Sequence, residues 1–181
     1  MRSPLLYLLG LWFLPTLAMG AAPELVAQDD AGRQVSLAEP PQRIISMAPH
    51  LTEMLFELGV QDRIIATVKH SDYPPAARQI PRLGDAFSIS IEAVINLSPD
   101  LILAWTTGGN QRTLAQLESL GYPVYQNESA TLQDIASSVR RIGVLVGEPV
   151  RGDALAKMFE QELDEIIRAR ESTRRAGVFF P

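Results

Sequence analysis

The stretch from Arg43 to Val68, "RIISMAPHLTEMLFELGVQDRIIATV", decides the fold class. Its two ends, "RIISMA" and "RIIATV", are short apolar runs that predict buried strands. Between them, apolar side chains recur at helical spacing, and Gly59 stands where such a helix would end. The helical face consists of Leu51, Met54, Leu55 and Leu58. A strand, a helix and a second strand in this order predict a parallel sheet.

The same alternation continues downstream through two more strands and three more helices. We expect the helices to begin after Ser90, Asn110 and Thr131, which are residue types that cap helix N-termini, and Asp134 adds capping-box spacing. The runs "LILAW" and "YPVYQ" between these helices predict the strands. Upstream, two short alternating runs around residues 29–32 predict a hairpin. The predicted fold class is therefore α/β, a mostly parallel sheet flanked by helices on both faces.

The first 20 residues have the three parts of a secretory signal peptide. Arg2 supplies the positive charge, Leu5 to Leu17 the apolar run, and residues 18–20 a small-residue cleavage site. The apolar run is short, and Pro15 interrupts it, whereas a membrane-spanning helix needs about 20 apolar residues. The chain has no cysteine for a lipid anchor or for disulfides. We therefore expect a soluble protein exported to the periplasm.

The composition argues against one class of partner, and the pattern near the end of the chain predicts a long helix. The net charge of −5 argues against nucleic acid as a partner, because nucleic-acid binders usually carry a basic face. The pattern over residues 150–172 predicts a long amphipathic helix, and the strand-like run "GVFF" follows it.

Motifs for catalysis or metal binding are weak. The turn "TTGGN" at residues 106–110 follows a strand and precedes a helix, which is the position of a phosphate loop. It lacks the glycine spacing of dinucleotide-binding and P-loop motifs, so a plain turn is the favoured interpretation. The only histidines, His50 and His70, have no metal-binding spacing. We interpret them as ordinary loop residues and expect no metal site.

Aromatic residues gather where a ligand is expected. The stretch "HSDYPPAARQIPRLGDAF", residues 70–87, is predicted to be neither helix nor strand, and it carries His70, Tyr73 and Phe87. Trp105 ends a predicted strand at the carboxyl end of the sheet, where open α/β sheets bind their ligands. These four side chains, on converging loops, indicate a large ligand with an apolar face.

Three segments together resemble the periplasmic binding proteins for vitamin B12, within the wider family that binds corrinoids, haem and ferric siderophores. They are "RIISMAPHLTEMLFELGVQDRIIATVKHSDYPPAA", "IPRLGDAFSISIEAVINLSPDLILAW" and "LESLGYPVY". The resemblance implies two α/β lobes joined by one long helix, with the ligand between them. It implies a binding protein rather than an enzyme, with cobalamin as the transported ligand, no bound cofactor, and a membrane-embedded ABC permease as partner.

The resemblance also implies a domain organisation. Residues 21–149 correspond to the N-terminal ligand-binding lobe and residues 150–172 to the joining helix. We interpret residues 173–181 as the start of a second lobe that the chain does not contain.

Individual residues take roles from the same resemblance. His70 falls where the B12 branch commonly has an aromatic contact to the corrinoid, and a histidine there adds a potential cobalt ligand. Trp105 corresponds to a pocket tryptophan, whereas Phe87 is offset by one residue from a family aromatic. Glu92 corresponds to the surface glutamate that docks onto arginines of the permease. Ligand contacts are thus expected at His70, Tyr73, Phe87 and Trp105.

Two alternatives stay open. The first is haem or a ferric siderophore on the same scaffold. Anionic siderophores favour clustered cations, whereas Lys69, Arg78 and Arg82 are scattered along one loop. The second is an α/β enzyme with its site at "TTGGN".

Overall fold

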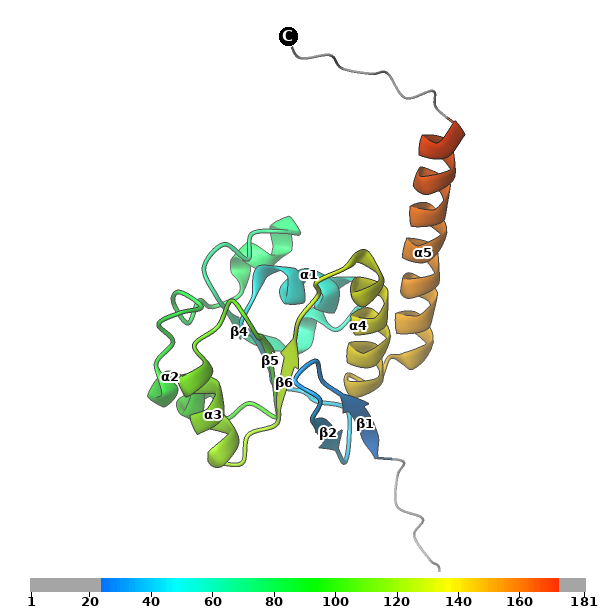
Figure 1. Cartoon of the computed structure of the whole chain (residues 1–181). Coiled ribbons are helices and arrows are strands. Elements are labelled where there is room, and N and C mark those ends of the chain that lie inside the picture. Colours follow the sequence, from blue (N-terminus) through cyan, green and yellow to red (C-terminus); the bar gives the residue numbers. More distant parts are fainter. Residues whose placement is uncertain (1–23, 173–181) are drawn as a thin grey trace, which may run out of the picture.

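A computed structural model describes residues 24–172 (Figure 1). Their centre is a four-stranded parallel sheet with the strand order β4-β3-β5-β6. The strands are β3 (Ile44–Ser46), β4 (Ile64–Thr67), β5 (Leu101–Trp105) and β6 (Val124–Asn127). The predicted parallel α/β fold is confirmed.

Helices cover both faces of this sheet. On one face pack α1 (Pro49–Glu57), α4 (Leu132–Leu145) and the antiparallel hairpin of β1 (Leu25–Gln28) and β2 (Gln34–Leu37). On the other pack α2 (Ile91–Leu97) and α3 (Gln111–Ser119). Strand β5 shows why two layers are needed, because its successive side chains point to opposite faces and both sets are buried. Leu101 and Leu103 join the first core, and Ile102 and Ala104 join the second.

Local sequence signals explain the helix ends. Ser90 accepts the Ala93 backbone N–H at the start of α2, and Asn110 caps α3 in the same way. Thr131 and Asp134 form the predicted capping box of α4. Helix α1 begins at Pro49, slightly before the predicted segment, because proline fits the first turn of a helix.

The stretch over residues 70–87 departs from its prediction in one part. It was expected to be neither helix nor strand, but Pro75–Gln79 form the short 3₁₀ helix η2. Proline at its first position presets the backbone angle φ for a helical turn. A second 3₁₀ helix, η1 (Gln61–Arg63), leads into β4.

Helix α5 (Pro149–Ser172) crosses α4 through two glycines. A Cβ atom on Gly143 would lie 3.0 Å from the Gly152 Cα, and a Cβ atom on Gly152 would lie 3.0 Å from the Val139 carbonyl oxygen. Glycine at these two positions therefore lets the two helix backbones approach closely. Arg140 of α4 adds ion pairs to Asp153 at 3.2 Å and to Glu160 at 2.7 Å.

The predicted helix over residues 150–172 is thus present, and its role in joining two lobes stays a prediction. The predicted signal peptide (residues 1–20) and the segment 173–181 lie outside the described residues. Among the helices of residues 24–172, none has both the length and the apolar character that crossing a bilayer requires.

Candidate functional site

Two cavities meet at Trp105, at the carboxyl ends of the parallel strands. The larger has a volume of about 470 Å³ and lies between α1, α4 and α5. The smaller has a volume of about 150 Å³ and lies between the loops that follow β3, β4 and β5. Trp105 lines both of them, so one indole ring forms a shared wall. This is the edge at which open α/β sheets bind ligands.

The smaller cavity unites three of the four predicted ligand residues. His70, Phe87 and Trp105 all line it. Tyr73 is not among the residues that line either cavity, and its side chain is 64% exposed. Phe87 is 62% exposed, so its ring is available to a ligand placed over the cavity rather than enclosed within it.

The loop that carries His70 is held from below by a chain of buried hydroxyl groups. Ser46, Thr52, Thr67 and Ser71 are linked in that order by three hydrogen bonds, each 2.8 Å long. Arg82 also donates to the Ser71 carbonyl oxygen at 2.8 Å. His70 itself is exposed and has a left-handed backbone with φ of 68°. The hydroxyl chain thus fixes the backbone from which the His70 side chain projects.

The Trp105 ring lies against Gly108. An added Cβ atom on Gly108 would lie 1.6 Å from the indole Cε3 atom, which no packing adjustment of a few tenths of an ångström can relieve. Only glycine at position 108 therefore permits this ring position. Trp105 as a whole residue keeps 37% of its surface exposed.

His50, in the first turn of α1, is the residue whose role the sequence did not reveal. Its ring meets the Trp105 ring edge-on, with centroids 5.7 Å apart and an interplanar angle of 88°. Its Nε2 atom lies 3.2 Å from the Asn127 Oδ1 atom. Burial lowers the pKa of His50 below its ordinary value, against the opposing effects of the Asn127 hydrogen bond and of Glu53 and Glu128. The signal that was available is its place a few residues beyond the carboxyl end of β3.

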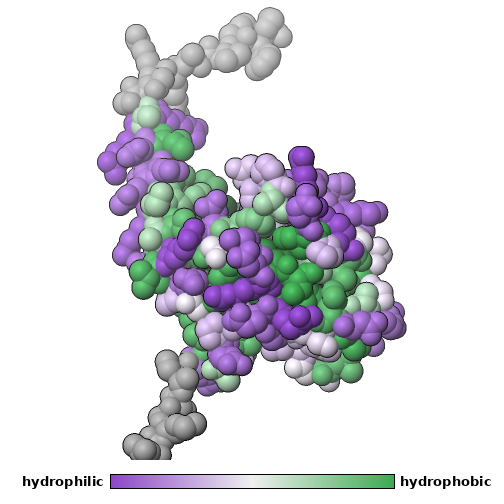
Figure 2. Space-filling model, turned by 180° about the vertical axis from the view of Figure 1, so that it is seen from behind, coloured by the Kyte–Doolittle hydropathy of each residue, from purple (hydrophilic) through white to green (hydrophobic). Residues whose placement is uncertain are grey.

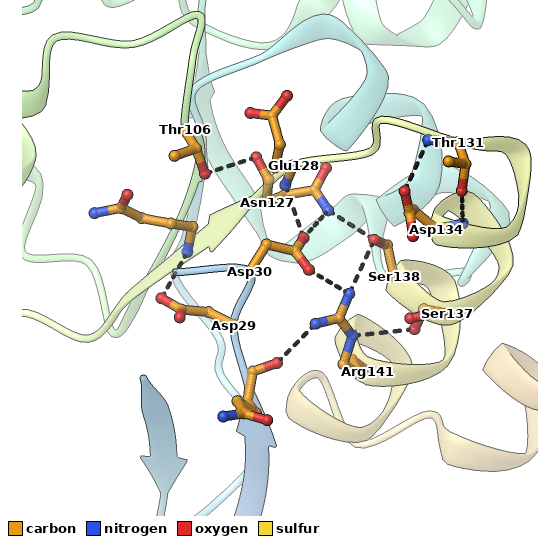
Figure 3. Close-up of polar contacts among 12 residues, drawn as sticks. Asp29, Asp30, Thr106, Asn127, Glu128, Thr131, Asp134, Ser137, Ser138 and Arg141 are labelled. Carbon is orange, nitrogen blue, oxygen red and sulfur yellow. Dashed lines mark hydrogen bonds and ion pairs between the residues drawn. The ribbon is translucent and has the colours of Figure 1, made fainter. Parts of the chain in front are cut away.

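Asn127 connects His50 to a charged network at the end of β6. Figure 3 shows the network around Asn127, Asp30 and Arg141. The Asn127 Nδ2 atom donates to Asp30 Oδ2 at 3.1 Å and to Ser138 Oγ at 2.8 Å. Asp30 also accepts the Glu128 backbone N–H at 2.7 Å and forms an ion pair with Arg141 at 2.6 Å. This network joins the hairpin turn, β6 and α4 behind the larger cavity.

The two donors of Thr107 in the turn "TTGGN" are already paired with a carboxylate. The Glu128 carboxylate accepts the Thr107 backbone N–H at 3.1 Å and the Thr107 hydroxyl at 3.1 Å. A carboxylate in this position repels an anion, so the geometry favours the plain-turn interpretation over a phosphate loop.

Glu92 lies away from both cavity linings, in the first turn of α2. Its carboxylate is fully exposed and accepts the Ser90 hydroxyl at 2.7 Å. This hydrogen bond holds the pKa of Glu92 below its ordinary value, so the group is ionised at neutral pH.

Apolar surface also runs along α5. Figure 2 shows green side chains along this helix and over the middle of the α/β lobe, bordered by purple ones. On α5, Met158 is 56% exposed, Ile166 66% and Ile167 43%.

Comparison with known proteins decides the family. A family model described as "Periplasmic binding protein" matches residues 44–179. The chain belongs to this family. Its relatives include the vitamin B12-binding protein of Vibrio cholerae, 38% identical over 141 residues, which cover 78% of this chain and 51% of the relative. The protein of the same name from Pectobacterium atrosepticum is 38% identical over 136 residues, which cover 75% of this chain and 49% of the relative.

Solved structures of periplasmic binding proteins have the same fold. The vitamin B12-binding protein BtuF of Vibrio cholerae superposes with a TM-score of 0.70 at 36% identity, covering 75% of this chain and 53% of that one. The haem-binding protein RhuT of Roseiflexus sp. RS-1 superposes with a TM-score of 0.67 at 28% identity, covering 74% and 52%. The chain thus spans about half the length of the relatives that it matches.

Proposed function

We propose that this chain captures cobalamin or a related corrinoid in the periplasm and delivers it to an ABC importer. The observation that carries the proposal is the meeting of two cavities at Trp105, with His70 and Phe87 beside the same ring. Exposed flat rings on a rigid sheet edge suit a flat macrocycle. Vitamin B12-binding relatives at 38% identity support the corrinoid as that macrocycle.

Binding without catalysis is the better account of the site. The family consists of binding proteins, and the turn that an enzyme would use for phosphate already holds the Glu128 carboxylate. We propose no bound cofactor, since cobalamin would be cargo. We further propose that residues 1–20 direct export to the periplasm.

Haem is the second candidate, because two haem-binding proteins superpose on 74% of the chain at 28% identity. Equilibrium dialysis of the purified chain against cyanocobalamin and against haemin separates the two by their absorption bands. We expect saturable cyanocobalamin binding that exceeds haemin binding. Saturable haemin binding without cyanocobalamin binding would instead establish the alternative.

Affinity is expected to be modest. Phe87 is 62% exposed and Trp105 37%, so their rings can contact one face of a macrocycle. Ligand pockets usually bury about 70–90% of the ligand, which is more than one face. We expect a dissociation constant in roughly the millimolar range, about −4 kcal/mol. Replacing His70 or Trp105 by alanine should each cost about 1–3 kcal/mol of binding energy. Unchanged affinity in both variants would exclude these residues from the site.

We propose Glu92 as the contact to the permease. Its exposed, ionised carboxylate on the first turn of α2 supports a role in an electrostatic encounter. Glu92→Gln should slow association with permease proteoliposomes, most clearly at low salt, and leave corrinoid binding intact. The matched control is Glu162→Gln, an exposed acid on α5. Equal association rates for both variants would contradict the docking role.

A further inference from the structure

The hydrogen atoms of Asn127 determine how His50 is protonated. Asn127 is completely buried, and its Nδ2 group donates to Asp30 and Ser138. An amide nitrogen carries two hydrogens, so both are used, and Oδ1 is the atom left facing His50. Since Oδ1 can only accept, His50 Nε2 must be the donor.

Asp30 prevents the reversed orientation of the Asn127 amide (Figure 3). Its carboxylate forms an ion pair with Arg141 at 2.6 Å and accepts the Glu128 backbone N–H at 2.7 Å, so it acts as an acceptor in this network. Turning the amide over would place Oδ1 against this carboxylate. The network therefore fixes Asn127, and Asn127 fixes His50.

The second ring nitrogen of His50 is consequently an acceptor. A neutral imidazole with its proton on Nε2 has a lone pair on Nδ1, and Nδ1 has no hydrogen-bond partner within residues 24–172. Burial favours this neutral form by lowering the pKa of His50. The edge-on contact with Trp105 at 5.7 Å restrains the ring further.

The larger cavity around His50 has a one-sided polar character. The charged side chains that line it are Glu53 and Glu57, and no lysine or arginine of residues 24–172 is among its lining. Ser129 also lines it, with a buried hydroxyl for which the described chain offers no partner. The cavity therefore presents the Nδ1 acceptor, two carboxylates and one hydroxyl that can donate or accept, beside an apolar wall. Such a surface attracts N–H donors and repels carboxylates.

We propose that His50 is a specificity-determining residue whose Nδ1 atom accepts an amide N–H of the ligand, so that the larger cavity selects side-chain amides over carboxylates. Corrinoids carry amides around the ring, whereas haem carries two carboxylates. The inference rests on the proposed function and deepens it. Asn127 and Asp30 are positioning residues, since they act through His50.

The tautomer is tested first, on the intact chain without ligand. Long-range ¹H–¹⁵N NMR spectra distinguish a proton on Nε2 from one on Nδ1, and the chain has only two histidines. His70→Gln leaves His50 as the single signal. We expect the Nε2–H tautomer at neutral pH. A predominant Nδ1–H form would overturn the proposal.

Selectivity is tested with matched corrins. Dicyanocobinamide carries side-chain amides and no nucleotide loop, and dicyanocobyrinic acid has the same ring with carboxylates in their place. The wild-type chain should prefer dicyanocobinamide. His50→Phe, which keeps a ring against Trp105, should weaken dicyanocobinamide binding about threefold to tenfold, as for one neutral hydrogen bond. Dicyanocobyrinic acid binding should not weaken in His50→Phe, and it should strengthen in Glu53→Gln.

The possible results distinguish the selectivity role of His50 from corrinoid binding itself. Equal loss of both corrins in His50→Phe, or no wild-type preference between them, would overturn the selectivity role and leave corrinoid binding standing. Failure of the wild-type chain to bind either corrin would refute the proposed function itself. The wild-type comparison needs no variant, so a poorly folded His50→Phe does not decide the result.

Discussion

The two cavities that share Trp105 are supported by different kinds of bonding. Behind the larger one, charged and amide groups link four parts of the chain through Arg141, Asp30, Asn127 and His50. Beneath the smaller one, neutral hydroxyl groups link β3, α1 and β4 to the loop at Ser71. The charged network contains groups that titrate, whereas the hydroxyl chain does not. We therefore expect the two cavities to respond differently to mutation and to pH.

Asn127→Leu should cause the largest loss of stability among the changes considered, chiefly in the network behind the larger cavity. The change keeps the side-chain shape but removes three hydrogen bonds, each contributing about 1 kcal/mol, so unfolding should become easier by about 3 kcal/mol. Chemical denaturation measures this loss. Ser138→Ala, which removes one of the three partners, is the graded control and should cost about a third as much. Equal losses in the two variants would mean that Asn127 does not organise the network.

Gly108→Ala should disturb both cavities, because the added methyl group displaces the shared Trp105 ring. Overpacking of this kind costs about 1–3 kcal/mol. In a Trp12→Phe background, Trp105 is the only tryptophan, so its fluorescence reports the displacement directly. In a Trp105→Ala background, adding Gly108→Ala should cost little further stability, because the ring that the methyl group would meet is gone. If Gly108→Ala costs as much stability there as in the wild-type background, the clash is not with the ring.

Thr67→Val should affect the smaller cavity alone. The isosteric change interrupts the hydroxyl chain between Thr52 and Ser71, and two lost hydrogen bonds correspond to about 1–2 kcal/mol. Amide hydrogen exchange should accelerate at Lys69 and Leu83, whose backbone bonds tie the loop to β4 and Gly84. His50 NMR signals should stay unchanged. Thr113→Val, on α3, provides the control for the substitution type.

Acidification should lower the stability of the region around the larger cavity. Its effect should be smaller than that of any of the three substitutions above. The pKa of His50 is lower in the folded state than its ordinary value of 6.5, because burial disfavours the cation. The stability that comes from neutral His50 is therefore present above about pH 6.5 and is lost as the pH falls through the folded-state pKa. Glu53 and Glu128 moderate the loss. Unfolding curves of the wild type and of His50→Phe should diverge with falling pH, and parallel curves would contradict this assignment.

Local signals made most of the fold predictable. The cap residues Ser90, Asn110 and Thr131 act on backbone groups two or three positions away, so their roles are visible in the sequence. The apolar runs of β3 and β5 are buried on both faces, and such strands are recognisable from short stretches. The 3₁₀ helix at Pro75–Gln79 was missed because a single proline-initiated turn looks like a loop.

Only those residues of the candidate site that the order of strands and helices brings together could be predicted from the sequence. His70 follows β4 and Trp105 ends β5, and both strand ends lie at the same edge of the sheet, so their approach was expected. The role of His50 depends on Asn127, which lies 77 positions later, and on the Trp105 ring. Asp30 was interpreted as a hairpin-turn residue, yet its carboxylate binds Asn127 and Arg141. No local pattern encodes contacts between such distant residues.

The close crossing of α4 and α5 at Gly143 and Gly152 acts as a fulcrum. Beyond it, α5 is a lever arm, because the part from Gly152 to Ser172 rises about 1.5 Å per residue and reaches about 30 Å. By the same geometry, a tilt of about 5° at the crossing would displace the far end by roughly 3 Å. Arg140, braced against Asp153 and Glu160, resists that tilt on one side of the pivot. Two glycines and one arginine thus contribute to holding the angle at which α5 leaves the lobe.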